Sequence, residues 1–320
     1  MGNDSQNRPA LPGSHPGLAV LLLSLLACDG GTAAAPVAAP VADAQQDASQ
    51  EVTAKPITKR LFVLDTIKFA RQNPKGVVVG WNLDNKVSDE TDTASCGKKD
   101  FVSPDGVPGI DNQFSILVPI IESSGIAAFE SLLQASVESG GVLLMVELDG
   151  LDHLSNDDQV EVRIRAGQGQ PLLGTDGKVL TGQTFHLNKR DPATVCGKGP
   201  LKDGVVDFGP FDIDLPLQIF GKEYILEMRS CHVRFRILDD QRIDAGVIGG
   251  GATLSSIAKI AKTAAEDQGN IDDIVQALTG GMGDLARDAT GTCTQMSAAL
   301  TFSGVSAFFY PSELTKTKKF

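Results

Sequence analysis

The sequence has no apolar stretch long enough to cross a membrane as a helix. Its longest, LAVLLLSLLA at residues 18–27, holds about ten residues, roughly half of the ~20 that a spanning helix needs. The sequence also lacks the GxSxG, HExxH and Walker signatures. The histidines that follow this stretch, His153, His186 and His232, stand far apart. These absences favour a non-enzymatic role and leave an enzymatic one open.

Dense basic segments and aromatic residues are also scarce. The 28 Lys and Arg residues are outnumbered by 40 Asp and Glu residues, which gives a net charge of −12. Proteins that bind nucleic acid gather Lys and Arg along the phosphates, so nucleic acid is not an expected partner. Aromatic residues make up only 5% of the chain, which argues against a platform for stacking sugars.

The short apolar run is typical of a signal peptide that is cleaved on export. It follows a polar, Pro/Gly-rich leader and ends in Leu25-Leu26-Ala27 immediately before Cys28. These four residues resemble the lipobox of bacterial lipoproteins. The resemblance implies that residues 1–27 are removed and that Cys28 carries lipid, which anchors the protein to a membrane of the cell envelope. We favour the outer membrane, and the acidic Asp29 leaves the inner membrane open.

The segment after Cys28 has the composition of a flexible tether. Residues 30–55 are rich in Ala, Pro, Gln and Asp and contain no aromatic residue, so they cannot bury enough apolar surface to fold. We interpret residues 28–58 as the tether. Residues 59–320 then form a single β-rich globular domain, since no further linker interrupts them.

Four cysteines remain once Cys28 is assigned to the lipid: Cys96, Cys196, Cys231 and Cys293. An even number in an exported protein predicts two disulfides, and the sequence leaves all three pairings open. The cysteines are widely spaced and form no CxxC motif, which argues against a zinc site.

The folded part consists mainly of short runs with the alternation of β-strands. In CHVRFRIL (231–238), Val233, Phe235 and Ile237 alternate with polar side chains, which indicates a sheet with one face in water. We expect further strands at 60–70, 76–83, 114–121, 142–151 and 159–167 and in short runs from 181 to 230. The fold class predicted is α+β, mainly antiparallel and sandwich-like.

Two regions have helical spacing instead. One helix is expected within Gly125–Gly141, inserted after the third strand, and a helical excursion near the C-terminus covers 252–265, 271–281 and 283–289. Gly246 and Gly249–Gly251 before this excursion are interpreted as a tight strand-to-helix turn. A closing strand is expected at 298–310.

The most distinctive segment is the long acidic stretch from Trp81 to Phe114. Calcium prefers six to eight oxygen ligands, which clustered Asp and Asn residues supply. The candidate calcium ligands are Asp84, Asp89, Asp92, Asp105, Asp111 and Asn112. The spacing is not that of an EF-hand, and a solvated loop pinned by a Cys96 disulfide is the alternative.

The same segment resembles a group of predicted lipoproteins of myxobacterial type. GWNLDNKVSDETDTASC followed by PDGVPGIDNQFSILVPII is similar to their G-(F/Y)-(D/N)-(L/I)-D-G segment, cysteine and DG…GIDN pattern. AGVIGGG, the helices after it, a cysteine and the closing strand extend the likeness over most of 61–309. The resemblance implies an exported lipoprotein of similar layout and implies no activity.

We therefore expect a lipid-anchored cell-envelope protein with a binding or structural role. Its partner is an unknown protein or glycan, and Trp81 with the acidic segment is the expected contact surface. The alternative is a secreted glycan-acting hydrolase, which needs two carboxyl groups held roughly 5 to 10 Å apart.

Overall fold

A computed structural model describes residues 58–93, 96–123, 129–219, 222–268 and 281–311. All of them lie in one compact unit, Ala54–Phe320. Cys28, the tether before residue 58 and residues 271–280 of a predicted helix lie outside the described residues. Among the helices of the described part, none has the length and apolar character needed to span a membrane.

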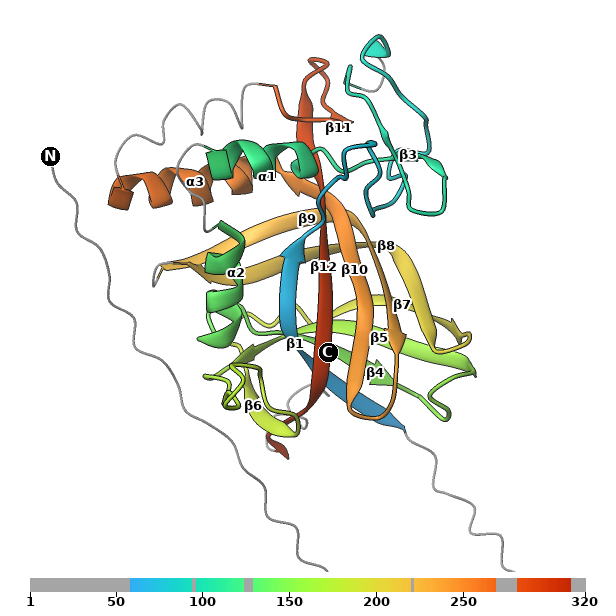
Figure 1. The fold of residues 1–320 in the computed structure, drawn as a ribbon, viewed down its shortest axis with the longest axis vertical. Coiled ribbons are helices and arrows are strands. Elements are labelled where there is room, and N and C mark those ends of the chain that lie inside the picture. Colours follow the sequence, from blue (N-terminus) through green and yellow to red (C-terminus); the bar gives the residue numbers. More distant parts are fainter. Residues whose placement is uncertain (1–57, 94–95, 124–128, 220–221, 269–280, 312–320) are drawn as a thin grey trace, which may run out of the picture. The chain divides into compact units, whose positions relative to one another are not determined.

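The unit is built on one strongly curved, mainly antiparallel sheet (Figure 1). Pairing runs in the order β7-β5-β4-β1-β12-β10-β9-β8, with β11 beside β12 and β6 beside both β5 and the end of β12. The main strands are β1 (Lys59–Phe69), β4 (Leu144–Asp149), β5 (Asp157–Gln168), β6 (Gln183–Leu187), β7 (Thr194–Leu201), β8 (Val205–Ile219), β9 (Lys222–Ile237), β10 (Arg242–Thr253), β11 (Leu285–Arg287) and β12 (Cys293–Phe309). The prediction of a mainly antiparallel β-protein is confirmed.

One apolar core lies inside the curve of the sheet. In β9 the side chains of Val233, Phe235 and Ile237 are buried in it, while Arg234 and Arg236 between them are exposed. Each large apolar side chain buried in this way contributes about 1.5 to 3 kcal/mol. The alternation predicted for this strand is confirmed.

Strand β1 is buried on both faces, which explains its continuous apolar run. Phe62 and Leu64 belong to the main core, whereas Leu61 and Val63 pack into a second cluster with Met145 and Phe309. β6 and the end of β12 contribute to this second cluster and cover that face of the sheet.

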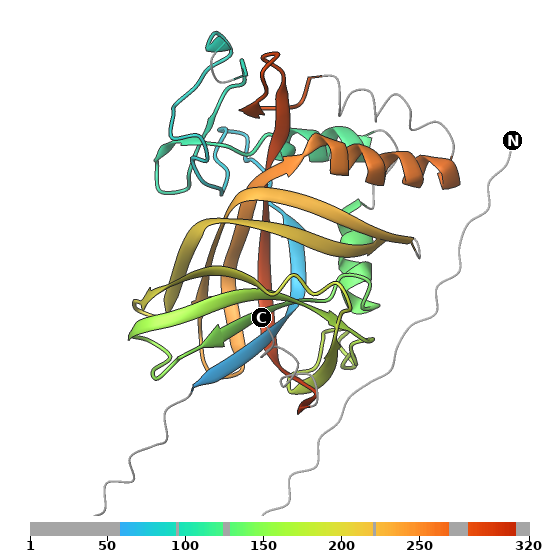
Figure 2. The same ribbon diagram turned by 180° about the vertical axis from the view of Figure 1, so that it is seen from behind.

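Three helices accompany the sheet: α1 (Phe114–Ser123), α2 (Phe129–Glu138) and α3 (Leu254–Gln268). α2 packs on β1, where the Gln134 side chain accepts a hydrogen bond from the Ile67 N–H and donates one to the Asp65 carbonyl. Both views show α1 and α3 beyond one end of the curved sheet (Figure 2). α2 lies within the predicted range Gly125–Gly141, and α3 overlaps the predicted range 252–265.

The strand predicted at 114–121 is wrong, because FSILVPII forms the helix α1. A short continuous apolar run fits a buried helix as well as a buried strand, so periodicity cannot separate them. The helix begins after Asn112, whose carbonyl accepts hydrogen bonds from the N–H and hydroxyl of Ser115. Leu117 and Val118 are buried, and α1 packs on β12.

Two more predicted elements are wrong. Residues 76–83 form no strand and make only isolated bridges, Val77 with Val102 and Trp81 with Asp111. Residues Leu285–Arg287 within the predicted helix 283–289 form β11 instead, because they pair with the start of β12.

The turn predicted at Gly246 and Gly249–Gly251 is also wrong, since these glycines lie inside β10. They are needed for close packing. A Cβ atom on Gly250 would lie 2.6 Å from the Cys231 Sγ and 2.9 Å from the Arg229 carbonyl oxygen. On Gly246 it would lie 2.4 Å from the Phe302 ring.

We predict that Gly250→Ala lowers the free energy of unfolding by about 1 to 3 kcal/mol, because the methyl group overpacks the contact with β9. Gly281→Ala is the matched control, because no atom lies within 4 Å of the position of its Cβ. Urea unfolding followed by circular dichroism measures both. Equal unfolding midpoints for the two variants would contradict the packing argument.

Candidate functional site

The acidic loop, defined as residues 81–114, is folded against the end of the sheet that α1 and α3 accompany (Figure 1). It contains the short paired strands β2 (Phe101–Val102) and β3 (Pro108–Ile110). A disulfide joins Cys96 to Cys293, across a sequence separation of 197 residues. The Gln113 N–H donates a 2.8 Å hydrogen bond to the hydroxyl of Ser297 in β12. The loop is therefore attached to the sheet at two places on one strand.

The second predicted disulfide is not formed, because Cys196 and Cys231 are free and buried in the main core. Burial raises the pKa of the Cys196 thiol to about 12 and that of Cys231 still higher. Both side chains are therefore protonated at neutral pH and behave as small apolar residues.

The six predicted calcium ligands do not come together as a set. Asp89 accepts hydrogen bonds from the N–H and hydroxyl of Thr91 within its own turn, and these bonds hold its pKa below the usual range. Asp105 is exposed, and Asp92 lies in the turn next to Asp89. Across the described ranges, no group of three or more His, Cys, Asp or Glu side chains is arranged to hold a metal ion. Calcium binding stays a prediction.

Among the five aspartates predicted as calcium ligands, Asp111 is the most deeply buried, and its carboxyl group lies in a network of hydrogen bonds. It is 5% exposed, and its Oδ2 accepts hydrogen bonds from the N–H groups of Leu83, at 2.6 Å, and Asp84, at 3.4 Å. Burial, and then the charges of nearby Asp100 and Asp84, raise the pKa of Asp111 to about 8. Its carboxyl group is therefore largely protonated at neutral pH.

Asp284 extends this network and was not predicted from the sequence. The pKa of its carboxyl group is raised to about 7, mainly by burial and in a smaller part by the charge of Asp100, although hydrogen bonds from Ser297 act to lower it. The Ser297 N–H donates to Asp284 Oδ1 at 2.7 Å, and the Ser297 hydroxyl donates to Oδ2. Because the same hydroxyl accepts from Gln113, Ser297 connects Asp284 to the acidic loop.

Asp100 completes the group. Its Oδ2 accepts a 2.6 Å hydrogen bond from the N–H of Ser88, and its side chain is hydrogen-bonded to Asp111. Burial raises its pKa. We call Asp100, which is half-buried, and the buried Asp111 and Asp284 the carboxyl cluster. The residues are as much as 184 positions apart, so no local sequence signal could have found them together.

An aromatic patch lies beside the loop on the outer face of β9 and β10. The ring of Trp81 stacks on His232, with centroids 5.6 Å apart and an angle of 25° between the planes. The guanidinium carbon of Arg234 lies 5.9 Å from the Trp81 centroid, and Asp207 pairs with Arg234 at 2.7 Å. A Cβ on Gly249 would come within 3.1 Å of the indole, so a glycine in β10 makes room for it.

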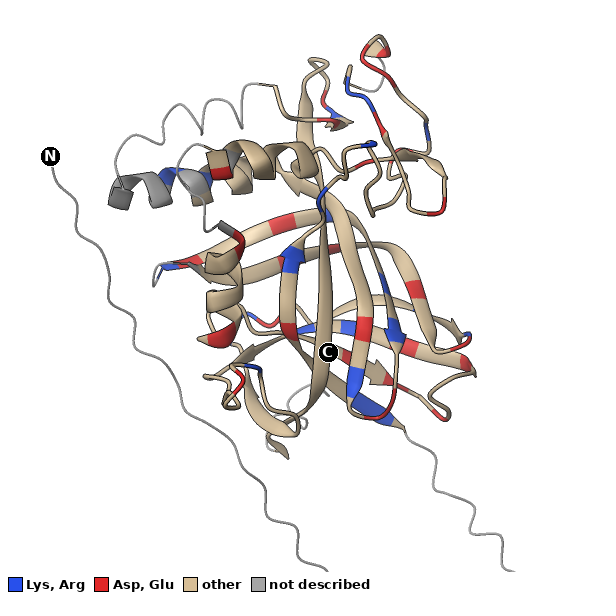
Figure 3. Cartoon of the chain, in the orientation of Figure 1, with Lys and Arg blue, Asp and Glu red and all other residues tan. Residues whose placement is uncertain are grey.

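The patch presents a cation and an aromatic ring together, which suits planar or anionic groups of a partner. The indole Nε1 of Trp81 is buried and has no hydrogen-bond partner among the residues that the structure describes. Arg234 is exposed, whereas His232 and Trp81 are half-buried. Figure 3 shows acidic residues along the loop beside it. The contact surface expected at Trp81 thus includes His232 and Arg234, which the sequence alone does not connect to Trp81.

No family model, curated protein or solved structure matches the chain. The resemblance to predicted lipoproteins of myxobacterial type stays a prediction.

We predict that the stability of this end of the molecule falls as pH rises. The folded state raises the pKa of Asp111 from 3.8 to about 8, so the folded protein holds this proton more tightly than the unfolded chain does. The stabilisation is complete below the unfolded pKa and is lost as pH rises through the folded one. Asp111→Asn keeps an oxygen for the Leu83 N–H and removes this titration.

The test compares urea unfolding midpoints from pH 5 to pH 8.5. Relative to the wild type, Asp111→Asn should gain stability as pH rises, whereas the exposed Asp105→Asn should follow the wild type at every pH. Parallel curves for Asp111→Asn and the wild type would show that Asp111 is not protonated in the folded state.

We also predict a pH-dependent fluorescence of Trp81, which is the only tryptophan. Burial lowers the pKa of His232 below its ordinary value near 6.5, so the stacked imidazole is neutral at pH 7. As the pH is lowered, Trp81 fluorescence should fall with a midpoint below pH 6.5, because the protonated imidazole of His232 quenches the indole. The variant His232→Gln should abolish this transition. His186→Gln, which removes a histidine stacked on Tyr310, is the control and should keep it.

Proposed function

We propose that the protein is a lipid-anchored component of the bacterial cell envelope, whose β-rich body binds a partner or has a structural role. The observation that carries the proposal is the Cys96–Cys293 disulfide, taken with the LLAC sequence that ends at Cys28. Disulfides persist in oxidising compartments outside the cytosol, and the lipobox resemblance implies the same route. Two independent features thus agree on export.

The disulfide also matters to the proposed contact surface. Closing a loop of this length removes entropy from the unfolded chain, which is worth roughly 5 kcal/mol in the chain-entropy model. In its described residues the acidic loop has only two short strands, and its Phe101 and Ile110 share a small apolar cluster with Val78, which precedes the loop. An oxidising compartment is therefore where this loop has its full stability.

We place the proposed partner contact at the acidic loop and the aromatic patch. Support comes from Trp81, which is held by the Asp111 bridge on one side and by His232 on the other, with the exposed Arg234 beside it. A rigid aromatic side chain next to an arginine is a frequent anchor of protein interfaces. The partner in this proposal is a protein or glycan of the envelope.

The proposal includes a sandwich-like packing of the sheet on itself. Val146 of β4 and Val162 of β5 belong to the same buried cluster as Val233 of β9 and Ile248 of β10. Strands far apart in the pairing order thus contribute to one core, as the two sheets of a sandwich do. The helices α2 and α3 correspond to the inserted helix and the C-terminal excursion.

Metabolic labelling with palmitate tests the anchor. We expect the wild type to incorporate label and to fractionate with membranes, and Cys28→Ser to remain unlabelled and uncut. Two of the remaining cysteines, Cys96 and Cys293, should react with maleimide only after reduction and denaturation. Unlabelled wild-type protein in the cytosol, with these two thiols reduced, would overturn the proposal.

A further inference from the structure

A second site lies at the opposite end of β12, where β12 and β1 separate. The two strands pair from Phe62 with Ser306 through Phe69 with Leu300. Beyond Ser306, β12 pairs with β6, while Lys59–Leu61 pair with β4. The described residues place a pocket of about 440 Å³ between the diverging strands. Its volume lies in the range typical of small-molecule sites.

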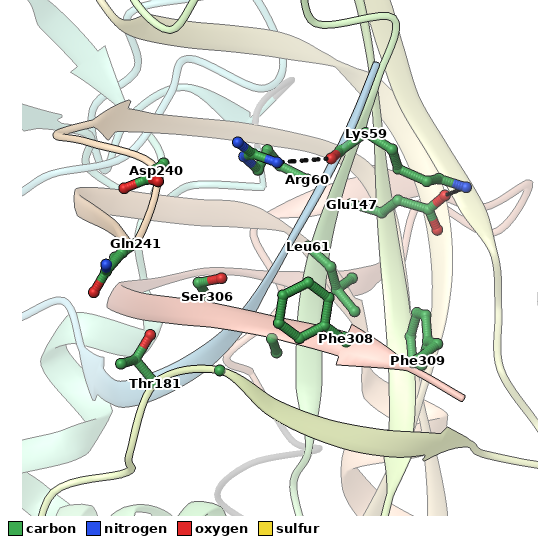
Figure 4. A pocket seen from close by; sticks show the side chains of 12 residues that line it. Lys59, Arg60, Leu61, Glu147, Thr181, Asp240, Gln241, Ser306, Phe308 and Phe309 are labelled. Atoms are coloured by element: carbon green, nitrogen blue, oxygen red, sulfur yellow. Dashed lines mark hydrogen bonds and ion pairs between the residues drawn. The ribbon is translucent and has the colours of Figure 1, made fainter. Parts of the chain in front are cut away.

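The pocket has an apolar side. Leu61, Ala307 and Phe309 line it and are nearly fully buried, so they form a wall that side-chain packing holds in place. Phe308 also lines it, yet its side chain is 56% exposed. Figure 4 shows Phe308 and Phe309 next to one another at the end of β12. They are consecutive residues of a strand, so they point to opposite faces, and only Phe308 is exposed. A hydrocarbon group that covers Phe308 would remove this apolar surface from water.

The pocket also has a cationic group with unused hydrogen-bonding capacity. Among the described residues, the guanidinium of Arg60 donates only a long, 3.5 Å hydrogen bond from Nη1 to the Lys59 carbonyl, and its Nε is buried without a partner there. Within the described part of the chain, no carboxylate lies within 4 Å of it. Lys59, in contrast, is paired with the buried Glu147. Arg60 is therefore the cation that a ligand would meet.

Two carboxylates share the lining with Arg60, the buried Glu147, which is paired with Lys59, and Asp240. Asp240 is exposed at the rim, in the turn between β9 and β10, and forms no ion pair with Arg60. In the view of Figure 4, Arg60 lies between Asp240 and the Lys59 backbone, away from the two phenylalanines. The pocket thus separates its polar rim from its apolar wall.

From this arrangement we infer that the pocket binds a single-chain anionic amphiphile, of the chemical class of a medium-chain fatty acid. The carboxylate of the ligand takes the free donors of Arg60, and its alkyl chain lies against Phe308, Leu61 and Phe309. Arginine suits this role because its planar fork matches a carboxylate. The site is independent of the acidic loop and of the lipid at Cys28, so its failure would leave the proposed function untouched.

The test uses residues 28–320 with Cys28→Ser, the part that remains after the proposed cleavage, so that neither the apolar run 18–27 nor a lipid is present. Isothermal titration calorimetry measures binding of dodecanoate below its micellar concentration, beside dodecyltrimethylammonium and acetate. We expect saturable binding of one dodecanoate per chain, and binding at least tenfold weaker for both other probes, because one has the opposite charge and the other lacks the chain.

Two variants test the charges. Arg60→Met keeps the length of the side chain and should weaken dodecanoate binding roughly 10- to 100-fold, since it removes hydrogen bonds to a charged group. Asp240→Asn removes the opposing carboxylate and should strengthen binding severalfold. Arg236→Met, an exposed arginine of β9 outside the pocket, is the matched control and should bind as the parent does. Thermal melting verifies that each variant is folded.

Equal affinity for the anionic and cationic probes, or unchanged binding by folded Arg60→Met, would overturn the inference. Cosedimentation with phosphatidylglycerol vesicles distinguishes a monomeric anionic amphiphile from the anionic lipids of a bilayer as the ligand. Arg60-dependent binding to vesicles without binding of monomeric dodecanoate would make this end a bilayer contact and would also refute the pocket assignment.

Discussion

Strand β12 is the constraint on which the rest of the described structure depends. It pairs with β1, β10, β11 and β6, and no other element connects so many parts of the sheet within the described ranges. Its first residue, Cys293, forms the disulfide, and Ser297 four residues later joins the acidic loop to Asp284. Further along, Phe302 enters the main core, and Phe308 and Phe309 line the pocket. A single extended segment thus fixes both proposed sites.

This arrangement makes the two ends of the molecule different in kind. At the acidic loop, polar groups are buried, and protons or hydrogen bonds satisfy the carboxyl groups of Asp111 and Asp284. At the pocket, the exposed ring of Phe308 shares the lining with an arginine whose donors are only partly used. The first end is stabilised from within the chain, whereas the second is completed by a ligand in our proposal. Strand β12 gives them a common scaffold without requiring that one respond to the other.

The sequence predicted the elements whose signals are local. The alternation in β9 and the helical spacing of α2 and α3 are read within ten to fifteen residues, because burial on one face imposes a fixed period. The strand prediction for FSILVPII was wrong because a short segment of almost entirely apolar residues has no alternation that separates a strand from a helix. The segment forms a helix that packs against β12. The turn predicted at the glycines of β10 was wrong for a related reason. Glycine signals a turn locally, yet here it accommodates the side chains of Phe302, Cys231 and Trp81 from other strands and the loop.

The sequence indicated which acidic segment forms the candidate site, but not which of its side chains lie together in the folded protein. The segment Trp81–Phe114 was singled out as a long acidic stretch, but the carboxyl cluster also includes Asp284, which stands in a stretch where a helix was predicted. Its partner Ser297 is brought close only by the register of β12. Long-range proximity of this kind follows from the topology of the sheet, which single-sequence periodicity does not encode.

Burial also explains why the four described cysteines resolve into one disulfide. Exchange between thiols and disulfides requires a thiolate that can reach a sulfur atom. Cys196 and Cys231 lie in the core with strongly raised pKa values, so each is almost entirely protonated and shielded from oxidants. Cys96 and Cys293 lie in the loop and at the strand end, where they pair. The sequence leaves open three ways to pair these four cysteines into two disulfides. The folded chain forms only the Cys96–Cys293 bond among them, because the apolar core around Cys196 and Cys231 keeps these two thiols from reacting.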